Sequence, residues 1–338
     1  MSLINQLNAT TEYFWLNTEP PVDILNKASA LLWKLMGNAL VNDNWNIKAH
    51  ETVDGGKMVK VPLKYAGSNR GGYSANTIIN QSKRDIIDAA RFGWGGAYGS
   101  NTLNLDDLTE NTGDEAIIDL TKQYMQSIIE SARIQLAADV IAAASAGLTA
   151  DGSVHINGLD DLFNMASGTL GATSVHYGSI TEAELPAWKA NVISTAEAIS
   201  FEVMQKVWRT PDMGDAAEKL PDWVCTTALL KDGYERSLHP QQRYTNTDVL
   251  NAGWKNVTFR DAPIVADSGI ATGRLYALNL GALSLRSHKD YNFTAPKWVS
   301  KEVLGQPDVI TADTRFRGNL YCKNRQLQVL HTNLTEPV

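Results

Sequence analysis

The feature that most constrains the fold is a long stretch without proline, from Thr112 to Ala146, bounded by a helix start and a helix stop. Thr112-Gly113-Asp114-Glu115 fits a capping box, in which the Thr112 hydroxyl accepts from the Glu115 amide and the Glu115 carboxylate accepts in return. Gly147 is a typical C-terminal stop. At 1.5 Å per residue we expect a helix of roughly 50 Å, which is long for a globular protein.

The predicted helix has a polar stripe and an apolar stripe. The polar stripe consists of Asp119, Lys122, Gln126, Glu130 and Arg133. The wide apolar stripe consists of Ile117, Ile118, Leu120, Tyr124, Met125, Ile128, Ile129, Leu136 and Val140. Such a helix is typical of a structural beam that packs along the rest of the protein.

Composition describes an ordinary acidic globular chain. Its 338 residues predict about two domains at roughly 150 residues each. Hydrophobic residues at 43% supply a substantial core and exclude a disordered chain. With 30 Lys and Arg against 37 Asp and Glu, the net charge is −7. Tight non-specific binding of nucleic acid needs a basic face, so the chain as a whole does not have that character, although a local basic patch stays open.

The cysteines and the N-terminus point to a chain that stays in the cytoplasm where it is made. The two cysteines, Cys225 and Cys322, are too few for a disulfide framework and are interpreted as reduced, buried thiols. The N-terminus lacks the basic and apolar regions of a signal peptide. No apolar stretch approaches the ~20 residues that a bilayer requires.

The first 44 residues predict one helix between polar flanks. Pro20-Pro21 and Asp23 favour a helix start, and Gly37 favours a stop. The apolar residues at helical spacing are Ile24, Leu25, Ala28, Leu31, Leu32, Leu35 and Met36. The polar flanks cannot fold alone, so we expect an arm that lies on something else.

Residues 45 to 101 predict extended structure separated by glycine. Trp45 to Val53 and Lys57 to Lys64 flank the turn signal Asp54-Gly55-Gly56 and predict a β-hairpin. Gly67 to Gly72 and Gly93 to Gly99 indicate tightly turning or flexible backbone. One face of the second strand carries Val59, Val61 and Leu63. Apolar side chains are few here, so we expect a projecting loop that finds its partner on a neighbouring molecule.

The second half of the chain predicts mixed helices and strands. Helices are expected at Glu197 to Trp208 and Ala228 to Leu238. Strands are expected at Trp223 to Thr226, Asn256 to Arg260, Ile264 to Ala266, Arg274 to Asn279 and Ser284 to Ser287. The end, Phe316 to His331, alternates and places Leu327, Val329 and His331 on one side.

No motif in the sequence predicts catalytic, cofactor-binding or metal-binding residues, and we expect no cofactor. The histidines include no pair three or four apart, and no Gly-x-Ser-x-Gly elbow occurs, although a dispersed triad stays open. Tyr98 interrupts the dinucleotide pattern in the Gly93 to Gly99 run, and Met58 interrupts a phosphate loop. The acid pairs Asp106-Asp107 and Asp160-Asp161 are interpreted as caps and solvated charge. The nine tryptophans are interpreted as anchors at domain and subunit contacts.

The order of these elements resembles that of the major capsid proteins of tailed double-stranded-DNA bacteriophages. Val59-Lys60-Val61-Pro62-Leu63 resembles the outgoing strand of the family's E-loop, and Thr112-Gly113-Asp114-Glu115-Ala116 resembles the entry to its spine helix. Further resemblances lie in Ile156 to Leu162, in Pro221 to Thr226, and most closely in the A-domain signature at Phe259 to Asp267 and Gly273 to Asn279.

The resemblance implies an α+β phage major-capsid fold. Its parts would be an N-terminal arm at 1–44, an E-loop at 45–103, a P-domain at 104–189 with the spine helix at 112–146, an A-domain at 190–295, and P-domain return strands at 296–338. Within Lys57 to Arg84 of the E-loop, the expected contacts between subunits are Lys57, Lys60, Lys64, Arg70 and Tyr73. Some relatives cross-link an E-loop lysine to a neighbouring asparagine, which these lysines match only by residue type; solvated hairpin lysines are the favoured interpretation.

The resemblance also implies partners. The chain would assemble with itself into pentamers and hexamers of an icosahedral head, enclosing double-stranded DNA without sequence-specific binding. The virion capsid would be assembled in the cytoplasm of a host bacterium, with no membrane involved. Because Met1 lies close to the arm, we expect a separate scaffolding protein and no large N-terminal cleavage; a portal and a decoration protein are further candidates.

The acidic net charge suits a shell that surrounds DNA without gripping it. The basic residues Arg315, Arg317, Lys323 and Arg325 are therefore assigned to subunit contacts. Two alternatives stay open. One is an encapsulin-like nanocompartment with protein cargo, and the other is a cytoplasmic enzyme with an unrecognised site in residues 190 to 295.

Overall fold

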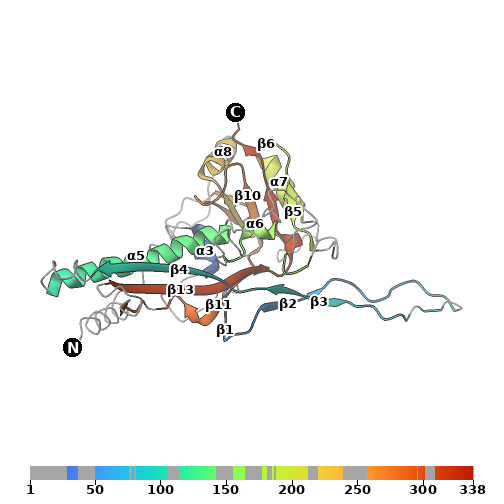
Figure 1. Cartoon of the computed structure of the whole chain (residues 1–338). Coiled ribbons are helices and arrows are strands. Elements are labelled where there is room, and N and C mark those ends of the chain that lie inside the picture. Colours follow the sequence, from blue (N-terminus) through green and yellow to red (C-terminus); the bar gives the residue numbers. More distant parts are fainter. Residues whose placement is uncertain are drawn as a thin grey trace.

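The structure is a computed structural model with two large sheets, a small two-stranded sheet, a long helix and a projecting hairpin (Figure 1). It describes residues 29–36, 50–75, 78–79, 81–104, 114–141, 155–163, 177–180, 185, 188–211, 220–238, 257–294, 296–300 and 309–337. No helix in this part of the chain is long and apolar enough to cross a membrane.

The first sheet is built around one long strand. Its members are β1 (His50–Val53), β4 (Gly95–Asn104), β11 (Leu283–Asn292), β12 (Val299–Ser300) and β13 (Val309–Cys322). β13 pairs antiparallel with β11, β12 and β4, and β1 joins as a parallel partner of β11. The long helix α5 (Asp114–Ile141) lies along β4 and β13 (Figure 1).

Helix α5 confirms the predicted beam over the residues that the structure describes. Its inner face buries the predicted apolar residues Met125, Ile128, Ile129, Leu136 and Val140. Arg133 is a correction: it was expected on the polar stripe, but it is buried, with its guanidinium over the Phe293 ring. The predicted cap at Thr112 and the end of the helix to Ala146 lie outside the described residues.

Two glycines on β4 let other parts of the backbone, one of them α5, approach this strand closely. A Cβ at Gly99 would lie 2.0 Å from the Ile128 carbonyl oxygen on α5, and a Cβ at Gly95 would lie 2.4 Å from the His155 carbonyl oxygen. The Gly93 to Gly99 run was predicted to turn or flex, and that prediction is wrong, since Gly95 to Gly99 begin a regular ten-residue strand. The glycines are explained by backbone packed against backbone.

The second sheet has six strands in the order β5-β14-β10-β7-β9-β8. These are β5 (Asn191–Ile193), β14 (Val329–His331), β10 (Leu275–Leu278), β7 (Trp223–Thr226), β9 (Ala262–Ala266) and β8 (Val257–Phe259). The helices α7 (Phe201–Arg209) and α8 (Ala228–Leu238) lie beside it, and β6 (Glu197–Ala198) pairs with β15 (Leu334–Thr335). The predicted bounds of β7 and α8 are confirmed.

Some predicted boundaries move for local reasons. α7 begins at Phe201, not at Glu197, because the Ser200 side chain caps it by accepting from the Val203 amide at 3.4 Å. The predicted continuous alternation over Phe316 to His331 is wrong, because β13 ends at Cys322 and the 3-10 helix η6 (Arg325–Leu327) intervenes before β14. Every residue of β14 is buried, since this strand lies between β10 and β5.

The predicted hairpin exists, but with a different partner strand. β2 (Val59–Lys64) pairs antiparallel with β3 (Ile87–Phe92), whereas β1 pairs with β11. β3 supplies the buried side chains Ala90 and Phe92, whereas Thr52 on β1 is exposed and offers β2 no matching apolar face. Gly55 and Gly56 have φ of 155° and 116° and bend the chain from the first sheet into the hairpin.

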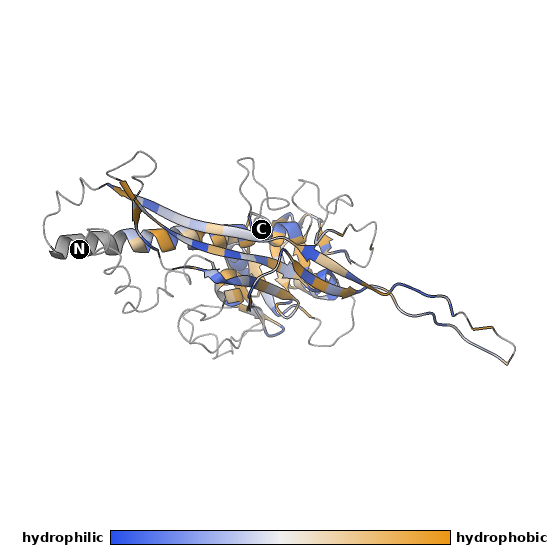
Figure 2. Ribbon diagram, turned by 60° about the horizontal axis from the view of Figure 1, so that its bottom comes forward, coloured by the Kyte–Doolittle hydropathy of each residue, from blue (hydrophilic) through white to orange (hydrophobic). Residues whose placement is uncertain are grey.

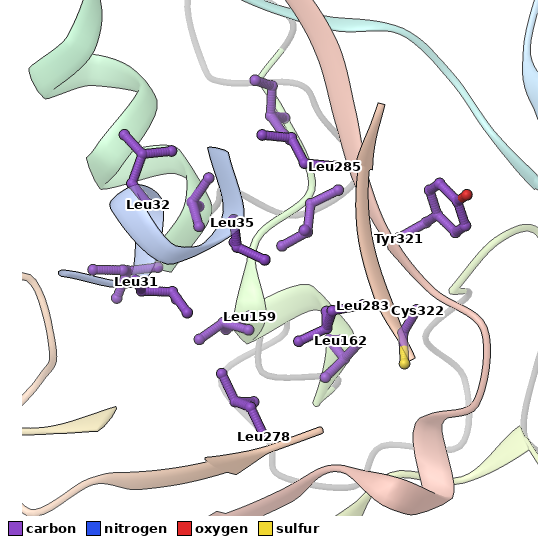
Figure 3. Close-up of a cluster of buried hydrophobic side chains, with 14 of the residues drawn as sticks. Leu31, Leu32, Leu35, Leu159, Leu162, Leu278, Leu283, Leu285, Tyr321 and Cys322 are labelled. Atoms are coloured by element: carbon purple, nitrogen blue, oxygen red, sulfur yellow. The ribbon is translucent and has the colours of Figure 1, made fainter. Parts of the chain in front are cut away.

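One apolar cluster connects both sheets, the hairpin root and the N-terminal helix. α3 (Ala30–Met36) inserts Leu31, Leu32 and Leu35 beside residues of α6 (Leu159–Leu162), β10 and β11 (Figure 3). The Ser29 hydroxyl also donates to the Asp267 carboxylate at 2.7 Å. The arm was expected to lie on another molecule; for residues 29–36 that is wrong, because this segment belongs to the core of its own chain. The rest of the arm lies outside the described residues.

The interpretation of the tryptophans as anchors at subunit contacts is wrong for four of the nine, whereas a role at domain contacts stays a prediction. Trp188, Trp208, Trp223 and Trp298 are buried inside the subunit. They therefore contribute to the core and are not exposed anchors for a partner.

Candidate assembly interface

The root of the β2–β3 hairpin is part of the core. Val59, Val61 and Leu63 are buried on one face of β2, as predicted, together with Ala90 and Phe92 of β3. The Phe92 ring lies 5.1 Å from the Tyr177 ring and 5.8 Å from the Tyr321 ring, measured between centroids. Such aromatic packing fixes the direction in which the hairpin leaves the subunit.

In the tip of the hairpin, residues 65–86, the residues that the structure describes have almost no packing within the subunit. Its described residues include no strand, and its two limbs point away from the body (Figures 1 and 2). The Tyr65 amide donates to the Ile86 carbonyl at 3.2 Å, and the Asn69 side chain donates to the Ser82 carbonyl at 2.7 Å. A hairpin segment without a hydrophobic core is only marginally stable by itself.

The five residues predicted to contact other subunits are all exposed. Lys60 and Lys64 alternate with the buried residues of β2, and Lys57 precedes that strand. Arg70 and Tyr73 lie in the tip, where 82% of Tyr73 is exposed. That they contact another subunit stays a prediction.

Sequence reasoning missed the apolar part of the tip. Ile78 is 95% exposed and Ile79 is 64% exposed, and Ile87 at the start of β3 is 66% exposed. The Ile78-Ile79 pair inside a polar stretch was the available signal. Neighbouring large apolar side chains that are exposed to solvent are typical of a contact surface.

A buried arginine holds the region between the two sheets. Arg325 is 1% exposed; its Nε and Nη2 donate to the Leu162 carbonyl at 2.9 and 2.6 Å, and its Nη1 donates to the Trp188 carbonyl at 2.6 Å. The guanidinium also lies 4.9 Å from the Tyr177 ring centroid. Arg325 was assigned to subunit contacts; that assignment is wrong, because the side chain is buried within its own subunit. Arg315, Arg317 and Lys323 are exposed.

The acid pair on α6 divides into two roles. Asp160 accepts from Arg274 Nη1 at 3.0 Å and from the Tyr276 hydroxyl at 2.9 Å, which ties α6 to β10. Asp161 is 7% exposed, and its Oδ2 has no hydrogen-bond partner among the described residues. Burial, aided by the nearby Asp160 charge, raises the pKa of Asp161 to about 7. The interpretation of this pair as solvated charge is therefore wrong; Asp106-Asp107 lies outside the described residues.

A second buried carboxyl lies near the end of α5. Asp139 Oδ1 is 2.9 Å from His155 Nδ1 and accepts from the Gln135 side chain at 2.8 Å. Burial raises the pKa of Asp139, which its hydrogen bonds to His155 and Gln135 partly offset. The pair connects the helix to the segment whose backbone contacts Gly95.

The described residues contain no cluster of three or more His, Cys, Asp or Glu side chains suited to a metal ion. Cys225 and Cys322 are free and buried, as predicted. Burial raises the pKa of Cys322 to about 12 and that of Cys225 as well, so neither thiol is an activated nucleophile. Among the described residues, the exposed apolar side chains of the hairpin tip are therefore the clearest candidate for a functional surface.

No protein-family model matches the chain, and no curated protein sequence matches it. Solved structures do. The capsid of cyanophage A-1(L) matches with a TM-score of 0.66 at 16% identity, over 86% of this chain and 92% of that chain. The capsid of a native GTA particle matches with a TM-score of 0.55 at 11% identity, over 86% and 89%. An encapsulin complex from Synechococcus elongatus matches with a TM-score of 0.49 at 9% identity, over 88% and 89%.

The chain therefore has a mixed α and β fold, and that fold is the capsid fold of tailed-phage major capsid proteins. The fold prediction made from the order of the sequence elements is confirmed. At these identities, the likeness establishes the shape of the subunit.

Proposed function

We propose that this protein is a structural major capsid protein without catalytic activity. It assembles into pentamers and hexamers of an icosahedral phage head that encloses double-stranded DNA. The observation that carries this proposal is the contrast within one hairpin of a capsid-fold subunit. Its root is packed in the core, whereas its tip exposes Tyr73, Ile78 and Ile79 to solvent. A hairpin that is held at its root and is apolar at its end is suited to contact a neighbouring subunit.

The parts of the proposed capsid subunit follow the predicted boundaries. Residues 1–44 are assigned as the arm, 45–103 as the E-loop, 104–189 as the P-domain with its spine helix, 190–295 as the A-domain and 296–338 as the return strands. The extended hairpin and α5 support this division, as does the six-stranded sheet, five of whose strands lie within residues 190–295. The contacts assigned to the E-loop are Lys57, Lys60, Lys64, Arg70 and Tyr73.

The proposed location is the capsid of a virion assembled in the host cytoplasm. The proposed partners are other copies of the chain, a separate scaffolding protein, a portal and a decoration protein. The net charge of −7 supports a shell that surrounds DNA without binding it tightly.

Negative-stain electron microscopy of the purified protein, expressed with any scaffolding protein encoded nearby, tests the proposal. We expect closed particles of uniform diameter. If particles isolated from the native host contain protein cargo and no DNA, the protein forms an encapsulin-like compartment, and the proposal of a phage head is refuted. Small oligomers with measurable turnover would favour an enzyme and refute the proposal.

A further inference from the structure

The last described residues cross the edge of the second sheet and fasten several of its neighbours. We call residues 332–337, which follow β14, the C-terminal strap. Its strand β15 pairs with β6, and the Leu334 amide donates to the Gly273 carbonyl at 2.9 Å. Arg236 Nη2 on α8 donates to Glu336 Oε2 at 2.7 Å. Only a short strand and a few polar contacts hold the strap, and segments of this kind open locally before the rest of a protein unfolds.

A buried histidine lies at the root of the strap. His331 is the last residue of β14, is fully buried, and pairs with the apolar residues Leu275 of β10 and Ile193 of β5. Its Nδ1 lies 2.8 Å from the Thr332 carbonyl oxygen, which only accepts hydrogen bonds, so Nδ1 carries the hydrogen. In the neutral ring Nε2 then has only a lone pair, and it has no hydrogen-bond partner among the described residues.

Among the described residues, two charged groups face this ring, one from β6 and one from α7. Glu197 Oε2 lies 3.9 Å from His331 Nε2, which is too long for a hydrogen bond. The other carboxylate oxygen, Oε1, accepts from Lys206 Nζ at 2.5 Å, and Lys206 Nζ also donates to the Thr195 hydroxyl at 3.3 Å. Lys206 therefore already pairs with the carboxylate that a charged imidazolium would need, and its own positive charge opposes a second one.

The site therefore suits the neutral ring better than the charged one. Desolvation by burial lowers the pKa of His331, and the Lys206 charge acts in the same direction, whereas the Thr332 carbonyl and Glu197 offset only part of the shift. When the strap and the paired β6 move away, Nε2 meets water and the ring regains its ordinary pKa of 6.5. Below that pH the open form binds a proton that the closed form does not, so the closed form loses stability as the pH falls.

We propose that His331 makes the C-terminal strap an acid-sensitive latch: the neutral ring keeps the strap closed on β6 and α8, and binding of a proton from solvent at Nε2 releases it. The latch concerns the folded subunit itself and does not depend on the proposed function. With the strap open, the contacts of Leu334 and Glu336 are lost, whereas the first sheet and α5 stay folded.

Hydrogen–deuterium exchange of the full chain at pH 7.5 and pH 5.0 tests the latch, with labelling times scaled for the intrinsic exchange rate. The peptide that contains the strap reports its opening, and a peptide from β13 reports global unfolding. Because pH 5.0 lies about 1.5 units below the ordinary pKa of 6.5, the opening constant of the strap should rise by up to about thirtyfold, while the protection of β13 stays unchanged. A rise below about twofold would overturn the inference, as would an equal loss of protection in β13.

Two variants separate the His331 ring from other effects of acid. His331→Gln keeps a polar side chain that does not ionise, so the protection of the strap should become independent of pH in this range. His288→Gln makes the same change at a half-buried histidine on β11, in the other large sheet, and should leave the acid response of the strap as in the wild type. An acid response that persists in His331→Gln would refute the latch.

Deuterium exchange at the imidazole C2 position gives a further measurement on the unaltered chain. Mass spectrometry of this exchange follows the protonation of each histidine, so the measurement does not depend on tolerance of the glutamine. We expect His331 to titrate with a midpoint below its ordinary pKa of 6.5. A midpoint at or above that value would show that the closed strap accepts the charged ring, and the inference would then be wrong.

Discussion

Replacing Asp161 with asparagine should stabilise the subunit at neutral pH, and the gain should grow with pH. Asp161 is 7% exposed, and burial raises its pKa from 3.8 to about 7. Between these values the folded state keeps a proton that the unfolded state releases. The slope of the unfolding free energy with pH is therefore negative, so this carboxyl lowers stability as pH rises from about 4 to about 7. Above pH 7 the penalty is constant.

The magnitude follows from the two pKa values. Each unit of difference corresponds to 1.36 kcal/mol, so the full penalty above pH 7 is about 4 kcal/mol. Between pH 5 and pH 8, the penalty grows by about 2 to 3 kcal/mol. The amide in Asp161→Asn cannot ionise and lacks this term, whereas both proteins share every other titrating group. The difference in unfolding free energy between variant and wild type should therefore widen by that amount.

Urea unfolding of the unassembled subunit at pH 5, 6, 7 and 8 measures this difference. Asp232→Asn on the exposed face of α8 makes a matched change from carboxyl to amide at the surface and controls for the loss of one negative charge. A difference between Asp161→Asn and wild type that stays constant from pH 5 to pH 8 would refute the reasoning. It would mean that Asp161 is already charged, or is hydrated, in the folded subunit.

Two further changes test the packing between elements. Gly99→Ala should lower the unfolding free energy by about 2 kcal/mol or more, because its Cβ would lie 2.0 Å from the Ile128 carbonyl oxygen; in Gly67→Ala the Cβ meets nothing within 4 Å, so urea unfolding should show no comparable loss. Arg325→Lys should lower the unfolding free energy by about 2 to 4 kcal/mol, because a single ammonium cannot replace three donors from a planar guanidinium. A loss of unfolding free energy below about 1 kcal/mol in thermal unfolding would contradict this. Arg317→Lys, at an exposed site on β13, is its control.

Elements whose residues carry their own pattern were predictable from sequence. α8 and β7 have the bounds that their periodicity and neighbouring turn residues indicate, and α5 follows its apolar stripe. The pairing of β1 with β11 was not predictable, because its partners are more than two hundred residues apart and β1 has only four residues. A glycine in a sequence can indicate either a turn or a place where another segment approaches the backbone closely. Gly99 belongs to the second kind, and only the position of α5 against it shows this.

The same ambiguity affected the polar residues. Arginine and aspartate usually lie on the protein surface, and only the tertiary structure shows that Arg325 and Asp161 are buried. A single sequence contains no record of burial for an isolated charged residue, because it has no periodic partner to reveal its face. The projecting loop was predicted correctly as an exposed segment, and its role as an interface between subunits stays a prediction.

Two glycines in the tip, Gly71 and Gly72, can show whether a second chain contacts the hairpin. At Gly71 and Gly72 an added Cβ meets nothing within 4 Å, and neither residue has the positive φ that favours glycine. Nothing inside the subunit therefore requires glycine there, whereas close approach of a second chain would. We expect Gly72→Val to leave the thermal midpoint of the unassembled subunit within about 1 °C, since no native contact changes, and to lower the yield of closed particles. Loss of subunit stability would show that the tip packs within its own chain, and an unchanged particle yield would show that no partner approaches this glycine.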